Sequence, residues 1–221
     1  MILLDDNFAT IVKAVKEGRR IYENIRKFIV YVLSCNLGEI LTIIFAPFLG
    51  LAIPLLPIHI LWVNLVTDGL PGLALVAEPA EKNIMNRPPR SPKENLFAGG
   101  LIPRILLTGI LLAAAAVFVQ WRVATGGYDV PTQQTAVFTT LCFVQLANGL
   151  SVRSVYHSMF TGGLFANRSM WIAIILTVVL QLLIVYAPFL HPIFRTKTLT
   201  WDVMRTVLFT TLVCLLSIEL I

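Results

Sequence analysis

The chain has 221 residues, of which 57% are hydrophobic and 13% are charged, and its net charge is +5. A soluble domain carries about 25% charged residues, so these charges are too few to cover a water-soluble globule, and a disordered chain would be much poorer in apolar residues. The composition excludes both classes and predicts a polytopic membrane protein.

Six apolar stretches are long enough to cross a bilayer, which takes about 20 mostly apolar residues. The sequence therefore predicts an all-α fold, a bundle of six transmembrane helices whose first partner is the lipid bilayer. Three tryptophans, Trp121, Trp171 and Trp201, lie at predicted span ends, where indole rings favour the membrane interface. The six stretches are roughly 26–48, 55–77, 101–120, 135–152, 169–187 and 201–221.

Lysine and arginine are divided unequally between the two sets of connectors. The N-terminal arm and the connectors at 78–100 and 153–168, with the adjoining span ends, hold thirteen of these residues. The connectors at 49–54, 121–134 and 188–200, with their span ends, hold four. Because positively charged loops stay in the cytoplasm, we expect the N-terminus and, after six spans, the C-terminus to be cytoplasmic. Orientation thus accounts for the positive charge, and no nucleic-acid partner is expected.

The N-terminal arm has the pattern of a helix that continues into the first span. No proline occurs before Pro47, and apolar residues recur at helical spacing, namely Phe8, Ile11, Val12, Val15 and Tyr22. The arm and the first span are predicted to form one helix of about 40 residues, roughly 60 Å long. Residues 1–25 would project into the cytoplasm as a stalk, and residues 26–221 would form the six-span membrane domain.

Two carboxylates, Glu39 and Asp68, lie in the middle of predicted spans, whereas Glu219 lies close to a span end. A carboxylate inside a bilayer costs at least about 2.5–3.5 kcal/mol on insertion scales, and such residues mark functional sites by default. The two intramembrane acids are therefore the most informative residues of the chain.

Neutral oxygen ligands accompany both acids. Asn36 lies three residues before Glu39, and Asn64 and Thr67 lie on the same helix face as Asp68. The glycines and proline at 69–72 are predicted to unwind the second span at this depth. Irregular backbone inside a membrane is tolerated only where it is buried in protein or lines a cavity.

Every one of these side chains can offer oxygen, which favours a hard cation such as calcium over a soft, thiophilic metal. The alternative is a hydrogen-bond network that only fixes helix packing. Cys142, Gln145 and Asn148 follow one another at three-residue steps in the fourth span and could supply neutral ligands or packing contacts. His59 is predicted to be structural rather than a ligand.

At these residues the sequence resembles the C-terminal membrane portion of calcium-type cation-transporting P-type ATPases, the group that includes the sarcoplasmic reticulum calcium pump and its bacterial relatives. The resemblance covers essentially the whole chain in order, and the middle stretch is the most specific. The matching stretches are DDNFATIVKAVKEGRRIYENIRKFIVYVLSCNLGEI, PLLPIHILWVNLVTDGLPGLAL and EPAEKNIMNRPPRSP.

The resemblance implies calcium ligands at Asn36, Glu39, Asn64, Thr67 and Asp68. In family members that bind two ions, the third-from-last span supplies a further glutamate. Cys142 or Gln145 stands in the matching region here, which favours one ion per cycle. The six spans would be the last six of the family's ten.

The resemblance also implies what the chain lacks. The family phosphorylates an aspartate in an Asp-Lys-Thr-Gly motif, and no such motif occurs in this sequence. Residues 1–25 match the end of the phosphorylation domain and the stalk helix. ATP and magnesium would act only through the missing N-terminal catalytic half, so this chain alone is expected to have no catalytic residue.

The function expected from the residues and the resemblance is ion binding in the membrane portion of an ATP-driven calcium pump, in a bacterial plasma membrane. One alternative is a pump of the same type for sodium, protons or manganese. Another is a channel or secondary transporter complete in itself, although the two halves of the sequence show no internal repeat.

Overall fold

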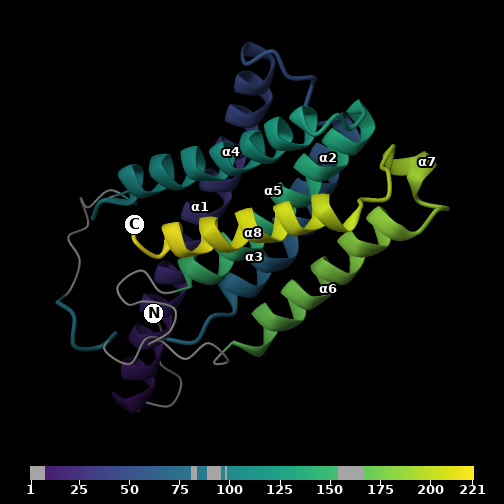
Figure 1. Ribbon diagram of the computed structural model, residues 1–221. Coiled ribbons are helices and arrows are strands. Elements are labelled where there is room, and N and C mark those ends of the chain that lie inside the picture. Colours follow the sequence, from purple (N-terminus) through teal and green to yellow (C-terminus); the bar gives the residue numbers. More distant parts are fainter. Residues whose placement is uncertain (1–7, 81–83, 89–95, 98, 154–166) are drawn as a thin grey trace.

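The computed structural model describes residues 8–80, 84–88, 96–97, 99–153 and 167–221, and this part of the chain is helical without β-strands. Six helical segments are long and apolar enough to cross a membrane (Figure 1). One of them, Pro57–Val76, consists of the consecutive elements α2, η1 and α3. The six segments confirm the predicted all-α bundle of six transmembrane helices. The helical elements are α1 (Phe8–Phe48), α2 (Pro57–Trp62), η1 (Val63–Thr67), α3 (Gly69–Val76), α4 (Leu101–Thr125), α5 (Val130–Val152), α6 (Arg168–Tyr186), α7 (His191–Phe194) and α8 (Trp201–Ile218).

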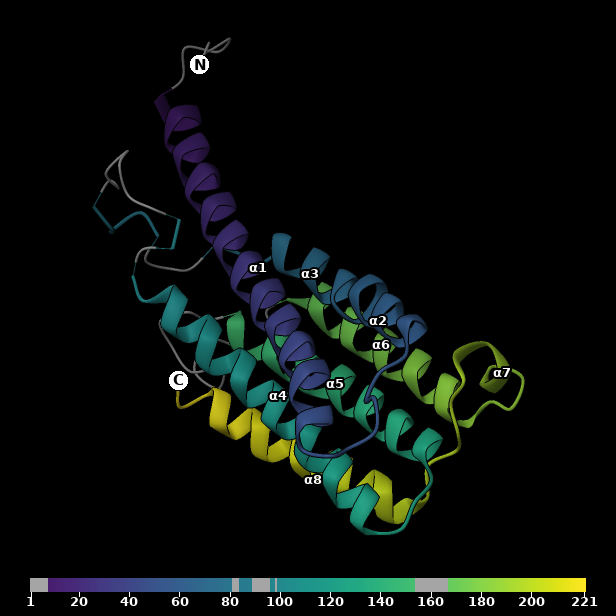
Figure 2. The same cartoon turned by 90° about the horizontal axis from the view of Figure 1, so that it is seen from above.

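Helix α1 is a single rod of 41 residues, as the uninterrupted apolar pattern predicts. At 1.5 Å per residue it is about 60 Å long, and its N-terminal half projects beyond the other helices (Figure 2). Arg19 braces this half by donating to the carbonyl oxygens of Ile84 and Arg87 at 2.8 and 2.7 Å, and Arg87 forms an ion pair with Glu23. Asp5, Asp6 and Asn7 are residue types that commonly cap a helix, and they lie outside the described residues.

Helix α5 forms the centre of the bundle, where it contacts α1, α4, α6 and α8. It is buried on all sides although it contains several threonines and amides. The hydroxyls of Thr135, Thr139 and Thr140 are satisfied locally, because each donates to the carbonyl oxygen four residues earlier at 2.7–2.8 Å. The sequence predicts this span from residue 135, but the helix begins at Val130, after Asp129.

Helices α1 and α4 approach closely at two glycines. A Cβ atom on Gly109 would lie 2.7–2.9 Å from three side-chain atoms of Leu37, and one on Gly38 would lie 2.9 Å from Cβ of Leu112. Small residues at a helix crossing permit such close approach in membranes. The crossing holds Glu39, the next residue after Gly38, at a fixed position against the rest of the bundle.

Candidate cation-binding site

Glu39 lies at the meeting point of three helical segments. Its carboxylate is buried, with the residue 3% exposed, and accepts hydrogen bonds from Asn64 Nδ2 on η1 at 2.9 Å and from Gln145 Nε2 on α5 at 2.8 Å. Both donors are neutral amides, so they hold the carboxylate in place without neutralising its charge. Gln145, which the sequence suggests only as an optional neutral ligand, is therefore in direct contact with the site.

The second span is irregular just before Asp68. Val63–Thr67 form one turn of π-helix, and the Asp68 amide donates to the Val63 carbonyl, five residues back, at 2.9 Å. The predicted irregularity is thus present, but it lies before the glycines and proline at 69–72, which belong to the start of α3. Glycine and proline are tolerated there because the first turn of a helix has amides without intrahelical partners.

Tyr31 on α1 supports this irregular turn. Pro71 has no N–H to donate to the Thr67 carbonyl four residues earlier, and the Tyr31 hydroxyl donates to that carbonyl instead, at 3.0 Å. Tyr31 itself is fully buried. The turn that carries the predicted ligands is therefore fixed to the same helix as Glu39, two turns away.

Asp68 is buried, with the residue 4% exposed, and neither of its carboxylate oxygens has a hydrogen-bond partner within the part of the chain that the structure describes. In that same part, no lysine, arginine or histidine nitrogen lies within 4.0 Å of Asp68 or Glu39. The side-chain oxygens of Gln145 and Asn148 are also buried without a donor. The candidate site therefore presents buried oxygen acceptors, and the described part of the chain places no cationic side chain beside its two carboxylates.

The remaining predicted ligands lie at different distances from this cluster. The Thr67 hydroxyl is buried and donates to Cys142 Sγ at 3.3 Å, and the Cys142 thiol donates to Gln181 Oε1 on α6 at 3.3 Å. Asn36 is half-buried on α1, one turn before Glu39, and its side chain makes no hydrogen bond to the described residues. The structure thus joins Glu39, Asn64 and the Thr67–Asp68 segment and leaves Asn36 at the edge.

The site is open on one side. Asn64 is exposed although its amide binds Glu39, and the neighbouring Leu61, Leu65 and Ile40 are 60%, 69% and 53% exposed. These residues lie on the faces of α1, α2 and η1 that no described helix covers. A cation at Glu39 and Asp68 could therefore take further ligands from this side.

His59 is structural, as predicted. Its Nδ1 accepts from the Leu56 amide at 3.3 Å and its Nε2 lies 2.8 Å from the Phe194 carbonyl, which requires the proton to be on Nε2. The ring also stacks on Phe138 with centroids 4.5 Å apart. Both nitrogens are occupied, so the ring has no lone pair left for a metal.

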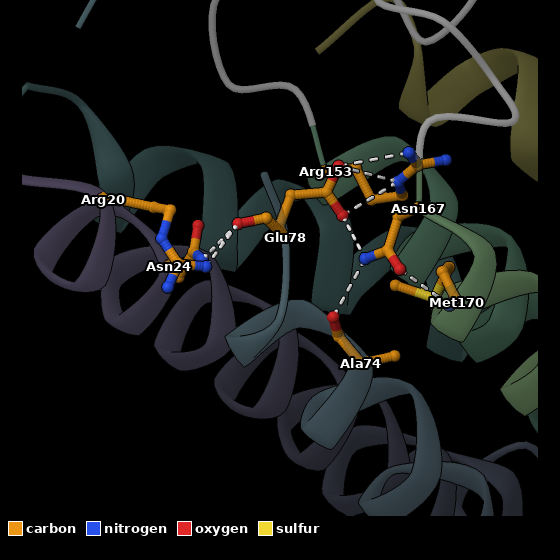
Figure 3. Close-up of polar contacts among 7 residues, drawn as sticks. All are labelled: Arg20, Asn24, Ala74, Glu78, Arg153, Asn167 and Met170. Carbon is orange, nitrogen blue, oxygen red and sulfur yellow. Dashed lines mark hydrogen bonds and ion pairs between the residues drawn. The ribbon is translucent and has the colours of Figure 1, made fainter. Parts of the chain in front are cut away.

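A third buried carboxylate, Glu78, was not identified by sequence reasoning. It follows α3 and forms an ion pair with Arg153 at the end of α5, with Arg153 Nε 3.2 Å from both carboxylate oxygens and Nη2 3.1 Å from Oε1 (Figure 3). Asn167, which caps α6, donates to Glu78 Oε2 at 2.5 Å and to the Ala74 carbonyl at 3.0 Å. We call Glu78, Arg153 and Asn167 the Glu78 cluster.

The Glu78 cluster also reaches α1. Asn24 donates to the carbonyl oxygens of Val76 and Glu78 at 3.0 and 2.8 Å, and Arg20 donates to the Glu78 carbonyl at 3.3 Å (Figure 3). These contacts fix the end of α3 to the projecting helix. The partners are 52 to 93 residues apart in sequence, so no local spacing could reveal them.

Comparison with known proteins gives one family match and several similar proteins. It matches the family described as "Cation transporting ATPase, C-terminus" over residues 52–221. "Calcium-transporting ATPase" of Bacillus subtilis (strain 168) is 45% identical over 204 residues, which cover 90% of this chain and 22% of that protein. "Calcium-transporting ATPase 1" of Bacillus cereus is 41% identical over 216 residues, covering 90% and 24%. "Calcium-transporting ATPase type 2C member 1" of Mus musculus is 35% identical over 218 residues, covering 98% and 24%. The chain thus spans less than a quarter of the length of these relatives.

Proposed function

Because the chain belongs to the C-terminal family of cation-transporting ATPases, we propose that it is the ion-binding membrane portion of an ATP-driven calcium pump. ATP hydrolysis, with its magnesium ion, belongs in this proposal to the catalytic half that accounts for the greater length of the relatives. Both ends of the chain would face the cytoplasm, in a bacterial plasma membrane. Calcium is the cargo, not a resident cofactor.

The observation that carries the proposal is the buried carboxylate of Asp68, whose oxygens have no hydrogen-bond partner among the described residues. A buried charge without a cation or a hydrogen-bond donor is strongly unfavourable, and such groups call for a ligand that the protein itself does not provide. Calcium takes 6–8 oxygens in flexible geometry. We assign Glu39, Asn64, Thr67 and Asp68 to this shell with Asn36 at its edge, and Gln145 joins them through its contact with Glu39.

The geometry supports a simple route by which movement could reach the site. The rod α1 carries Glu39, and its projecting half is braced by Arg19 and Arg87. A push on that half would move Glu39 relative to η1 and α5, which carry its two amide donors. The turn at Val63–Thr67 has π-helical hydrogen bonds in place of the regular α-helical ones, and we expect it to deform more easily than a regular helix. Such π-turns are frequent at functional sites.

The proposal can be tested in a chimera in which this chain replaces the matching C-terminal region of the Bacillus subtilis relative. Calcium-stimulated ATP hydrolysis is measured in the chimera, in Glu39→Gln and Asp68→Asn variants, and in the control Glu17→Gln, whose carboxylate is exposed on α1. We expect either site variant to raise the calcium concentration for half-maximal activity at least about tenfold, since hard-cation affinity follows ligand charge. The control should be unchanged.

Unchanged calcium activation in both site variants would disprove the ligand assignment. Competition by manganese, sodium and protons in the same chimera separates the cations. If another cation activates the chimera and calcium does not, the site serves that cation instead. Ion flux through the purified chain in vesicles without ATP would favour a channel or secondary transporter.

A further inference from the structure

A groove between α4 and α8 lies at the opposite end of the bundle from the Glu78 cluster. The two helices contact each other and run in opposite directions, so that the end of α4 lies beside the start of α8 (Figures 1 and 2). The groove has a volume of about 760 Å³. We call it the α4–α8 groove; its principal lining residues are Phe118, Arg122, Tyr128, Trp201, Arg205 and Phe209.

Both helices present the same order of side chains to the α4–α8 groove. Arg122 lies three residues before the end of α4 at Thr125, and Phe118 lies four residues deeper on the same face. On α8, Arg205 lies four residues after the start at Trp201, and Phe209 lies four residues deeper. Four residues are about one helical turn, or roughly 6 Å. The groove thus has a level of two arginines and, one turn further into the bundle, a level of two phenylalanines.

The depth of these two levels matches the boundary of a bilayer. Trp201 and Tyr128 border the arginine level, and tryptophan and tyrosine favour the interface because one end of each ring is polar. Phe209 is 67% exposed on the membrane-spanning part of α8 and therefore faces lipid acyl chains. The arginine level is at headgroup height, and the phenylalanine level is at acyl-chain height.

The charges at the arginine level suit one anionic group. Within the described residues, Arg122 has no carboxylate within 4.0 Å, and Arg205 has only Asp202, at 3.8 Å on the exposed surface. Two guanidinium groups and one carboxylate leave a net charge of +1 in the groove. Guanidinium groups bind phosphate through paired, charge-assisted hydrogen bonds.

We propose that the α4–α8 groove binds an anionic phospholipid, with its phosphate between Arg122 and Arg205 and an acyl chain along Phe118 and Phe209. The site is separate from the cation site, and the proposal does not depend on calcium transport. A single-phosphate headgroup such as phosphatidylglycerol matches the net charge of the groove, whereas phosphatidylcholine brings a choline cation to the arginine level.

Native mass spectrometry of the purified full chain in detergent tests the proposal. The chain is titrated with phosphatidylglycerol, with phosphatidylcholine and with free glycerol phosphate. We expect retained phosphatidylglycerol at concentrations at least tenfold below those needed for phosphatidylcholine, and no retention of glycerol phosphate. The double variant Arg122→Gln/Arg205→Gln should lose this preference, and Phe209→Ala should weaken binding of both lipids.

Arg195→Gln is the matched control, since Arg195 is an exposed arginine in the connector on the same side of the bundle but does not line the groove. Equal retention of the two lipids by the unmodified chain would overturn the proposal, as would an equal loss in Arg195→Gln and the double variant. Retention of glycerol phosphate as strong as that of the lipid would identify a phosphate site rather than a lipid site. All affected residues are exposed or half-exposed, and circular dichroism of each variant checks that the helices are intact.

Discussion

Asp68 and Glu78 are carboxylates ten residues apart, and they are almost equally buried, at 4% and 6% exposure. Their surroundings differ completely. Glu78 has a bidentate ion pair with Arg153 and a hydrogen bond from Asn167. Neither oxygen of Asp68 has a partner among the described residues.

This difference separates a carboxylate with a structural role from the carboxylate that we propose as a cation ligand. A buried charge is tolerated when it is paired and hydrogen-bonded, and it is costly otherwise. The Glu78 cluster therefore holds the ends of α3 and α5 and the start of α6 together, and these are fixed to α1 by Asn24 and Arg20. Asp68 has no such partner among the described residues, and in the proposed function a bound cation would supply one.

The largest expected effect comes from breaking the satisfied cluster. Arg153→Ala leaves Glu78 buried without its cation, and removing one partner of a buried pair costs about 3–5 kcal/mol. We expect a markedly lower melting temperature of the purified chain in detergent. The double variant Glu78→Leu/Arg153→Met, which removes both charges, should recover part of the loss, and a double variant no more stable than Arg153→Ala would contradict the pairing.

The opposite sign is expected at the unsatisfied site. Asp68→Asn replaces a buried carboxylate by a neutral amide of similar shape, which costs less to bury than a charge, so without calcium the variant should be more stable than the unmodified chain. Melting in the presence of a calcium chelator measures this. A lower melting temperature than the unmodified chain would mean that the fold itself needs the charge of Asp68.

Tyr31→Phe tests the support of the irregular turn. The change removes the hydroxyl that donates to the Thr67 carbonyl. Because Pro71 has no N–H to donate to this carbonyl, the carbonyl loses its hydrogen bond, at a cost of about 1–2 kcal/mol. The melting temperature of the chain measures the loss of stability. In the chimera described above, we expect the variant to raise the calcium concentration for half-maximal ATP hydrolysis. If the stability falls but the calcium response does not change, the turn supports the fold without positioning ligands.

The smallest effect is expected at an exposed carboxylate that serves as a reference for the two buried ones. A hydrogen bond from Lys197, with a second from Thr132, lowers the pKa of Asp129 below its usual value of 3.8. A lowered pKa adds stability above pH 3.8 that is lost as the pH falls through the pKa of the folded state. Lys197→Ala should cost less than about 1 kcal/mol at pH 7.

Melting curves of Lys197→Ala and of the unmodified chain from pH 7 down to pH 3 check this reference. The two curves should converge at the lowest pH, where Asp129 is protonated in both proteins. A loss as large as that in Arg153→Ala would show that burial is not what separates these carboxylates.

Residue patterns along the sequence predicted the spans, and they singled out Asn64, which the structure places in contact with Glu39. The apolar run before Pro47 predicts the rod α1, and the i, i+3 and i+4 spacing of Asn64, Thr67 and Asp68 predicts one face beside Glu39. The structure places the irregular turn earlier than the glycines suggest and adds the short helix α7. Gln145 donates to Glu39 because α5 packs against α1 with Gln145 on the contacting face. No residue pattern within α5 alone shows which of its faces contacts α1.

The sequence by itself determined that the chain crosses a membrane six times, that its first helix is a long rod and that two acids lie inside the bilayer, because length, hydropathy and helical spacing are local properties. Only the tertiary structure decided which carboxylate is neutralised. Arg153 and Asn167 meet Glu78 across 75 and 89 residues, and Asp68 meets no cation within the described residues. Whether a buried charge has a partner depends on which helices pack together, and that is fixed by the whole bundle rather than by any segment of it.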